Sequence, residues 1–352
     1  MSIRPEFPEL NPREKEVLGY IIQNFITTAT PVASQSLVQR NRLNVSSATV
    51  RSAMNTLEAK GLLNHPHTSA GRVPTDLGYR FYVDTLMRQA FLTREEEEAL
   101  DRLALTVKND MDEGVRSAAR ILARLSNLLA VVISPRYAQG IFRKMELISL
   151  SSTRLMVVLT IDSGYVRTVS IEVESEISRK HLDHISSILN ERLTGIVISE
   201  IATNIEEIVA DIREEDESGL IRVFVDSADT IFDETDVKRF HFGGVEYIAL
   251  QPEFNDLSQY RSIIELIENE HLIVHLLENE TKDQEISIRI GSENELRHIG
   301  QCSVVSASYN IGNIKGAVGL VGPTRMNYPR MVALVDQISQ RLSRGESFRT
   351  LR

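Results

Sequence analysis

Hydrophobic residues near the start of the chain recur every three to four positions, which predicts amphipathic helices. The first helix is expected to begin at Asn11, because Pro12 and Glu14 then occupy the first and third helical positions after an N-cap residue. A short second helix is expected at about residues 34–40, and a third follows Ser46 and ends at Gly61. Three helices in this order, with a short polar turn before the third, predict a helix-turn-helix.

The third predicted helix has one apolar and one polar side. The apolar side carries Val50, Ala53, Met54 and Leu57. The polar side can donate or accept hydrogen bonds throughout and carries a single charge, which is what reading base edges in a major groove requires. We therefore predict that this helix contacts DNA through Ser46, Ser47, Thr49, Arg51, Ser52 and Asn55.

A hairpin or wing is predicted at residues 62–74, where two short strands flank a tip rich in Ser, Gly and Pro. Such a wing is suited to the phosphate backbone or the minor groove. We expect its DNA contacts to come from His67, Ser69 and Arg72. The helical pattern alone is also compatible with a protein-interaction fold that does not touch DNA.

The rest of the chain alternates between helical and strand periods, which predicts α+β structure. A capping box at Thr93 and Glu96 begins a new helical section, and a strand is expected at 129–134. Further elements are expected as follows: strands at 145–150, 155–161 and 166–173, helices at 178–190 and 203–214, a helix at 259–280 broken near Asn269, strands at 285–290, 301–310 and 315–321, and a closing helix at 328–342.

Charge is divided unevenly along the 352 residues, whose formal net charge is −10. Residues 1–92 carry ten Lys and Arg against seven Asp and Glu, and the remainder carries a balance of −13. This division suits a regulator that touches DNA at one end only. The single cysteine, Cys302, excludes an internal disulfide and a Cys-rich metal site. Because no signal peptide or membrane-spanning stretch is evident, we expect a cytoplasmic protein without a membrane partner.

Several tempting sites have simpler interpretations. The glycines at 312, 316, 319 and 322 match no phosphate-loop spacing, and His65 and His67 have no third metal ligand nearby. A buried structural thiol explains Cys302 better than a nucleophile, and no familiar catalytic spacing is present. We therefore predict no enzyme activity, cofactor or metal.

The roles of Arg325 and Tyr328 remain open. They could contact a ligand or a partner domain, or they could lock the last hairpin onto the closing helix.

Two long motifs carry a family resemblance. The first combines residues 46–51 (Ser46 to Arg51), the stretch from Leu57 to Leu63, and residues 67–80, which read His-Thr-Ser-Ala-Gly-Arg-Val-Pro-Thr-Asp-Leu-Gly-Tyr-Arg. The second is residues 319–329, which read Gly-Leu-Val-Gly-Pro-Thr-Arg-Met-Asn-Tyr-Pro. Together they closely resemble the HrcA family of heat-inducible transcription repressors. The resemblance covers nearly the whole chain and is weakest at about 162–253.

The resemblance implies an α+β multidomain protein. Its parts would be an N-terminal winged helix-turn-helix at 1–90, a GAF-like α+β domain at 91–139 and 218–345, and an inserted α+β dimerisation domain at 140–217. It implies a homodimeric repressor of chaperone operons, which binds double-stranded DNA at an inverted-repeat operator of the CIRCE type. It also implies that the GroEL chaperonin promotes the active form and that heat relieves repression. Two alternatives stay open: a regulator gated by a small ligand in the GAF-like domain, and an enzyme or chaperone cofactor whose head makes only protein contacts.

Overall fold

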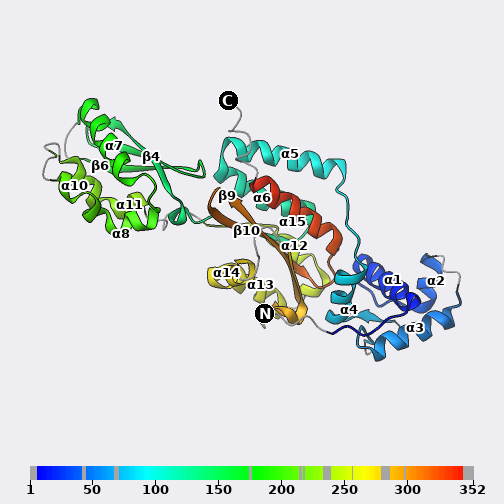
Figure 1. Ribbon diagram of the computed structural model, residues 1–352. Coiled ribbons are helices and arrows are strands. Elements are labelled where there is room, and N and C mark those ends of the chain that lie inside the picture. The colour runs from blue at the N-terminus through cyan, green and yellow to red at the C-terminus, as the bar shows by residue number, and fades with distance from the viewer. Residues whose placement is uncertain are drawn as a thin grey trace.

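The computed structural model describes residues 6–41, 45–66, 71–173, 177–213, 216, 219–232, 239–255, 257–278, 286–296 and 299–343. It is a mixed α+β protein in three parts (Figure 1). We call residues 6–86 the head, residues 141–232 the lobe, and the remaining described residues the body. The head and the lobe lie at opposite ends of the molecule, with the body between them (Figure 1).

In the residues described, the head consists of three helices, a two-stranded antiparallel sheet and a final helical segment. Its elements are α1 (Pro12–Thr28), α2 (Ser34–Asn41), α3 (Ser47–Ala59), β1 (Leu63–Asn64), β2 (Val73–Pro74), α4 (Asp76–Phe81) and a π-helical turn η1 (Tyr82–Leu86). The capping box predicted at the start of α1 is confirmed, because the Asn11 and Glu14 side chains each bond the other's backbone N–H. Val17, Ile21 and Leu57 are fully buried and join α1 to α3.

The body is built on a five-stranded antiparallel sheet in the order β7-β3-β10-β9-β8. Its strands are β3 (Leu129–Ile133), β7 (Phe240–Gly243), β8 (Ser287–Ile290), β9 (Cys302–Ile311) and β10 (Ile314–Pro323). The strands expected at 129–134, 301–310 and 315–321 are confirmed, whereas β7 was not predicted. The strand expected at 285–290 is confirmed as β8, except for residue 285, which lies outside the described residues.

Helices cover both faces of this sheet, so its three central strands, β3, β10 and β9, are buried on two sides. One layer consists of α5 (Arg94–Asn109), α6 (Met111–Ser126) and α15 (Tyr328–Ser343), and the other of α12 (Val245–Ala249), α13 (Leu257–Glu268) and α14 (Glu270–Glu278). Successive residues of β3 face opposite layers. Ala130 and Val132 pack into the hydrophobic core on one face of the sheet, and Val131 and Ile133 pack into the core on the other face. The helix break expected near Asn269 is confirmed, since this residue separates α13 from α14.

The lobe contains the predicted three-stranded antiparallel meander, in the order β4-β5-β6. Its elements are β4 (Phe142–Ser151), β5 (Arg154–Ile161), β6 (Val166–Glu172), α7 (Arg179–Leu193), α8 (Ile198–Ile208), α9 (Ala210–Arg213), α10 (Leu220–Asp226) and α11 (Ala228–Phe232). Helix α7 packs against β4, and α11 packs against α8. The helix expected at 203–214 was placed too late, because α8 already begins at Ile198.

Candidate nucleic-acid interface

Helix α3 presents a polar face because its other face is held in the core of the head. Val50 and Leu57 are fully buried. Ser46 caps the helix, since its Oγ accepts a hydrogen bond from the backbone N–H of Thr49 at 3.1 Å. The hydroxyls of Ser46 and Thr49 also lie 2.9 Å apart. Among the predicted contacts on α3, Ser47 is half-buried, and the exposed ones are Thr49, Arg51, Ser52 and Asn55.

One side chain of the predicted wing, Arg72, reaches this face from the position just before β2. Arg72 Nη2 donates a hydrogen bond to Asn55 Oδ1 at 3.1 Å. Arg72 Nε lies 2.7 Å from Glu58 Oε2, and the exposed fractions of these two side chains are 14% and 34%. Two of the predicted DNA contacts, Asn55 and Arg72, are therefore joined to each other. His67 and Ser69, the other predicted wing contacts, lie outside the described residues.

The base of the wing is fixed by the backbone. The N–H of Val32 donates to the carbonyl of Arg72 at 2.9 Å, and the N–H of Arg72 donates to the carbonyl of Val32 at 3.0 Å. Gly71 passes so close to Pro31 that a Cβ there would lie 2.7 Å from the proline carbonyl carbon. The glycine in the Gly-Arg-Val-Pro part of the motif is therefore required by this close approach.

The end of α3 is fastened to α1 by an ion pair. Lys60 Nζ lies 2.7 Å from Glu14 Oε2 and donates to the carbonyl of Glu9, also at 2.7 Å. The hydrogen bond from Lys60 holds the pKa of the Glu14 carboxyl below its usual range, although burial acts in the opposite direction. These contacts hold the C-terminal end of α3 against the start of α1.

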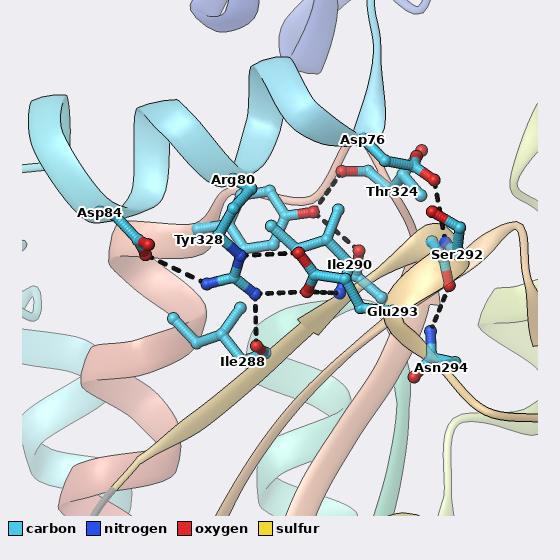
Figure 2. Close-up of polar contacts among 12 residues, drawn as sticks. Asp76, Arg80, Asp84, Ile288, Ile290, Ser292, Glu293, Asn294, Thr324 and Tyr328 are labelled. Atoms are coloured by element: carbon cyan, nitrogen blue, oxygen red, sulfur yellow. Dashed lines mark hydrogen bonds and ion pairs between the residues drawn. The ribbon is translucent and has the colours of Figure 1, made fainter. Parts of the chain in front are cut away.

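The head joins the body through the end of the first motif, as Figure 2 shows. Arg80 donates to both carboxylate oxygens of Glu293, at 2.8 and 2.5 Å, and to the carbonyl of Ile288 at 2.5 Å. It also bonds Asp84, at 3.1 Å. A bidentate arginine–carboxylate pair with low exposure fixes both position and angle. Asp76 extends the joint by accepting the backbone N–H of Ser292 at 2.8 Å (Figure 2).

The second motif lies at the same joint. The Tyr79 and Tyr328 rings are 5.8 Å apart. Tyr328 donates its hydroxyl proton to the carbonyl of Thr324 at 2.6 Å, so the Ser303 hydroxyl, 2.7 Å away, is the donor to the Tyr328 oxygen. Tyr328 therefore locks the final hairpin to the closing helix, which was one of the two predicted roles for this motif.

Arg325 has the other predicted role, contact with a partner domain, because it contacts the head. It forms an ion pair with Glu253, donates to Gln251 at 2.9 Å, and lies 3.4 Å from the carbonyl of Ile26 at the end of α1. The two motifs, more than 200 positions apart, thus meet where the head sits on the body.

The sites that the sequence disfavoured have structural explanations. A Cβ at Gly319 would lie 2.5 Å from Leu277, and one at Gly322 would lie 2.6 Å from Leu128, so both glycines serve packing. Cys302 is 2% exposed, and burial raises the pKa of its thiol to about 12, as expected of a structural cysteine. Within the described ranges, no three His, Cys, Asp or Glu side chains gather as metal ligands. The described helices include none long and apolar enough to cross a bilayer.

Comparison with known proteins decides the family. A family model described as the HrcA protein C-terminal domain matches residues 112–332. The heat-inducible transcription repressor HrcA of Chlorobium phaeobacteroides (strain BS1) is 40% identical over 352 residues, covering 97% of this chain and 99% of that protein. The protein of the same name from Prosthecochloris aestuarii is 39% identical, covering 95% of this chain and 97% of its own. The chain belongs to the HrcA family.

This is a family of heat-inducible transcription repressors and not of enzymes. A crystal structure of a hypothetical protein is similar over 96% of this chain and 98% of its own, with a TM-score of 0.67 and 26% identity. The HrcA model begins within α6 and therefore does not include the head. The predicted DNA contacts of α3 and the wing stay predictions.

Sequence reasoning missed two acidic residues that pair with arginines of the first motif. Glu58 forms an ion pair with Arg72, and Glu293 forms one with Arg80, but neither carboxylate was singled out. For Glu58 a signal existed, because it follows Asn55 by three positions and so lies on the same side of the helix. Glu293 is 213 positions from Arg80, and no local pattern connects the two.

Proposed function

We propose that this protein is a sequence-specific DNA-binding repressor acting in the cytoplasm, with the head as a winged helix-turn-helix and α3 as its recognition helix. The observation that carries the proposal is the row of exposed polar residues at Thr49, Arg51, Ser52 and Asn55, on a helix whose opposite face is buried. A helix held in this way can enter a major groove without losing its own packing. The first 92 residues carry a net positive charge, which also favours the head as the DNA-binding end of the molecule.

Replacing Arg51 with alanine tests this assignment. If Arg51 bonds a guanine through both ends of its guanidinium, its loss should weaken operator binding by about 1–3 kcal/mol and leave binding to random DNA nearly unchanged. Arg94→Ala is the matched control, because Arg94 is an exposed arginine at the start of α5, outside the head. An equal loss on operator and random DNA would make Arg51 a phosphate contact instead.

The operator in this proposal is an inverted repeat of the CIRCE type, bound by a homodimer. One head covers few base pairs, so specific binding requires two heads. A homodimer with two-fold symmetry matches the two-fold symmetry of an inverted repeat. We assign dimerisation to the lobe, as an insert in a GAF-like body. On the side of its sheet away from α7, the exposed apolar residues include Ile148 at 40%, Leu150 at 54% and Val166 at 51%. An exposed apolar sheet face is typical of an interaction surface.

The dimer can be tested by sedimentation of the double variant Ile148→Lys with Leu150→Lys. We expect it to sediment as a monomer and to bind a half-operator as well as the full one. Leu105→Lys, on an exposed position of α5 in the body, provides the control and should remain dimeric. A double variant that stays dimeric would refute the lobe as the dimer interface.

Relief on heat stress completes the proposal, with the GroEL chaperonin favouring the active form. A partner that binds only the folded repressor raises the active fraction by mass action. Operator affinity should therefore fall on heating and recover when chaperonin is added. Full affinity without chaperonin, together with melting far above growth temperature, would contradict this control.

A further inference from the structure

The hydrogen bond between Arg72 and Asn55 fixes the direction of an amide that we place against DNA. An arginine side chain has five N–H donors and no acceptor. The Asn55 atom that lies 3.1 Å from Arg72 Nη2 must therefore be the oxygen, Oδ1. The amide nitrogen Nδ2 is then the end that does not face Arg72, and a rotation that exchanged the two would bring donors face to face.

Glu58 holds the arginine in this position. Its carboxylate lies 2.7 Å from Arg72 Nε and stands one turn of α3 beyond Asn55. The backbone of Arg72 is tied to Val32 by two hydrogen bonds, so both ends of the residue are fixed. With its side chain only 14% exposed and its charge beside a carboxylate, Arg72 is poorly placed to bind a phosphate.

We propose that Arg72 is a positioning residue for base recognition, which turns the donor end of Asn55 toward the DNA. This inference rests on the proposed function, that α3 enters the major groove. It replaces the expectation that Arg72 itself contacts the backbone or the minor groove. The contacts among Glu58, Arg72 and Asn55 thereby determine which bases Asn55 can recognise.

The selected bases follow from the major-groove pattern of donors and acceptors. Guanine offers acceptors at N7 and O6, thymine at O4 and adenine at N7, whereas cytosine presents only the N4 amino donor. A fixed Nδ2 donor favours an acceptor edge and meets cytosine donor to donor. An amide able to turn over would accept either edge and discriminate less.

Two substitutions at Arg72 separate positioning from phosphate binding. Arg72→Lys keeps a side chain that only donates, so the Asn55 amide should keep its direction. Arg72→Gln ends two bonds short of the Nη2 that meets Asn55, so it releases the Asn55 oxygen and leaves the amide free to turn over. Both leave a long side chain in place, and circular dichroism checks that each variant is folded.

The experiment measures the affinity of the full chain for the inverted-repeat operator and for duplexes with single base-pair changes. Asn55→Ala first locates the base pair that Asn55 contacts. Changing that base pair lowers the affinity of the native protein but not that of the Asn55→Ala variant. At that pair, exchange to a cytosine on the contacted strand should weaken the native protein and Arg72→Lys by about fivefold or more. For Arg72→Gln the same exchange should change affinity by less than about twofold.

Three results would contradict the inference that Arg72 positions Asn55. Arg72→Gln would overturn the inference if it lost affinity equally on every duplex and reduced the salt slope by about 1, as loss of a phosphate contact does. Undiminished discrimination in Arg72→Gln, or no base pair sensitive to Asn55→Ala, would also overturn it. Failure of the proposed function is distinguishable, because the native protein would then bind operator and scrambled duplex alike.

Discussion

Replacing Gly78 with alanine should destabilise the head, whereas the same change at Gly19 should stabilise it. A Cβ at Gly78 would lie 2.2 Å from the carbonyl oxygen of Leu62 and 3.1 Å from its carbonyl carbon. That carbonyl accepts a hydrogen bond from Thr75, and the N–H of Leu62 donates to Leu57. The backbone of Leu62 is therefore held from two sides and cannot retreat without breaking these bonds.

The magnitudes follow from the two environments. Overpacking of this kind costs about 1–3 kcal/mol, which at Gly78 outweighs the gain in helix propensity. Gly19 lies inside α1, and a Cβ there would meet nothing within 4 Å. Alanine at that position should stabilise the head by about 0.5–1 kcal/mol. The two variants should thus differ in stability by about 1.5–4 kcal/mol.

Hydrogen exchange followed by mass spectrometry is the suitable assay, because a chain of several parts need not unfold in one step. Peptides of α1 and α3 should exchange faster than native in Gly78→Ala and more slowly in Gly19→Ala. Peptides of the lobe should be unchanged in both. Native protection in Gly78→Ala, or a shift of both variants in the same direction, would refute the packing argument at Leu62.

Three further predictions concern single side chains. Tyr328→Phe removes the hydroxyl that bonds Thr324 and Ser303, and should lower the free energy of opening of the body by about 1–3 kcal/mol, measured by hydrogen exchange of peptides from β10 and α15. Cys302 should react with a thiol reagent only after unfolding, since burial raises its pKa to about 12; rapid labelling of the native chain would contradict this. The lowered pKa of Glu14 means that its bond to Lys60 stabilises the head fully above the ordinary value of 4.5, and that this stability is lost as the pH falls through the lowered value. Melting curves between pH 6 and 3 should therefore show a smaller loss in Lys60→Met than in the native protein, and equal losses would argue against the pair.

Local elements could be predicted because their signals are local. The caps at Asn11, Ser46 and Thr93 depend on residues three positions apart, and all three occur where the sequence indicated. The meander of the lobe followed from its alternation and its short turns. Strand β7 was missed because its four residues pair with β3 more than 100 positions away. A strand that short has too little alternation to stand out from a loop.

The candidate site divides in the same way. The outward face of α3 could be predicted from helical periodicity alone, and the structure exposes four of its residues. The direction of the Arg72 side chain could not, because it depends on the tertiary contact of Arg72 with Glu58. The joint of Arg80 with Glu293 is likewise set by tertiary packing. The motifs indicated important residues, and only the structure showed that several of them serve the joint between head and body.

The central claim is sequence-specific DNA binding by the head, and one titration tests it most directly. The purified chain would be added to a labelled inverted-repeat operator and to a scrambled duplex of the same composition, at two salt concentrations. We expect preferential binding to the operator, two protomers per site, and an affinity that weakens as salt rises. Equal affinity for both duplexes, unchanged when chaperonin is added, would contradict the claim.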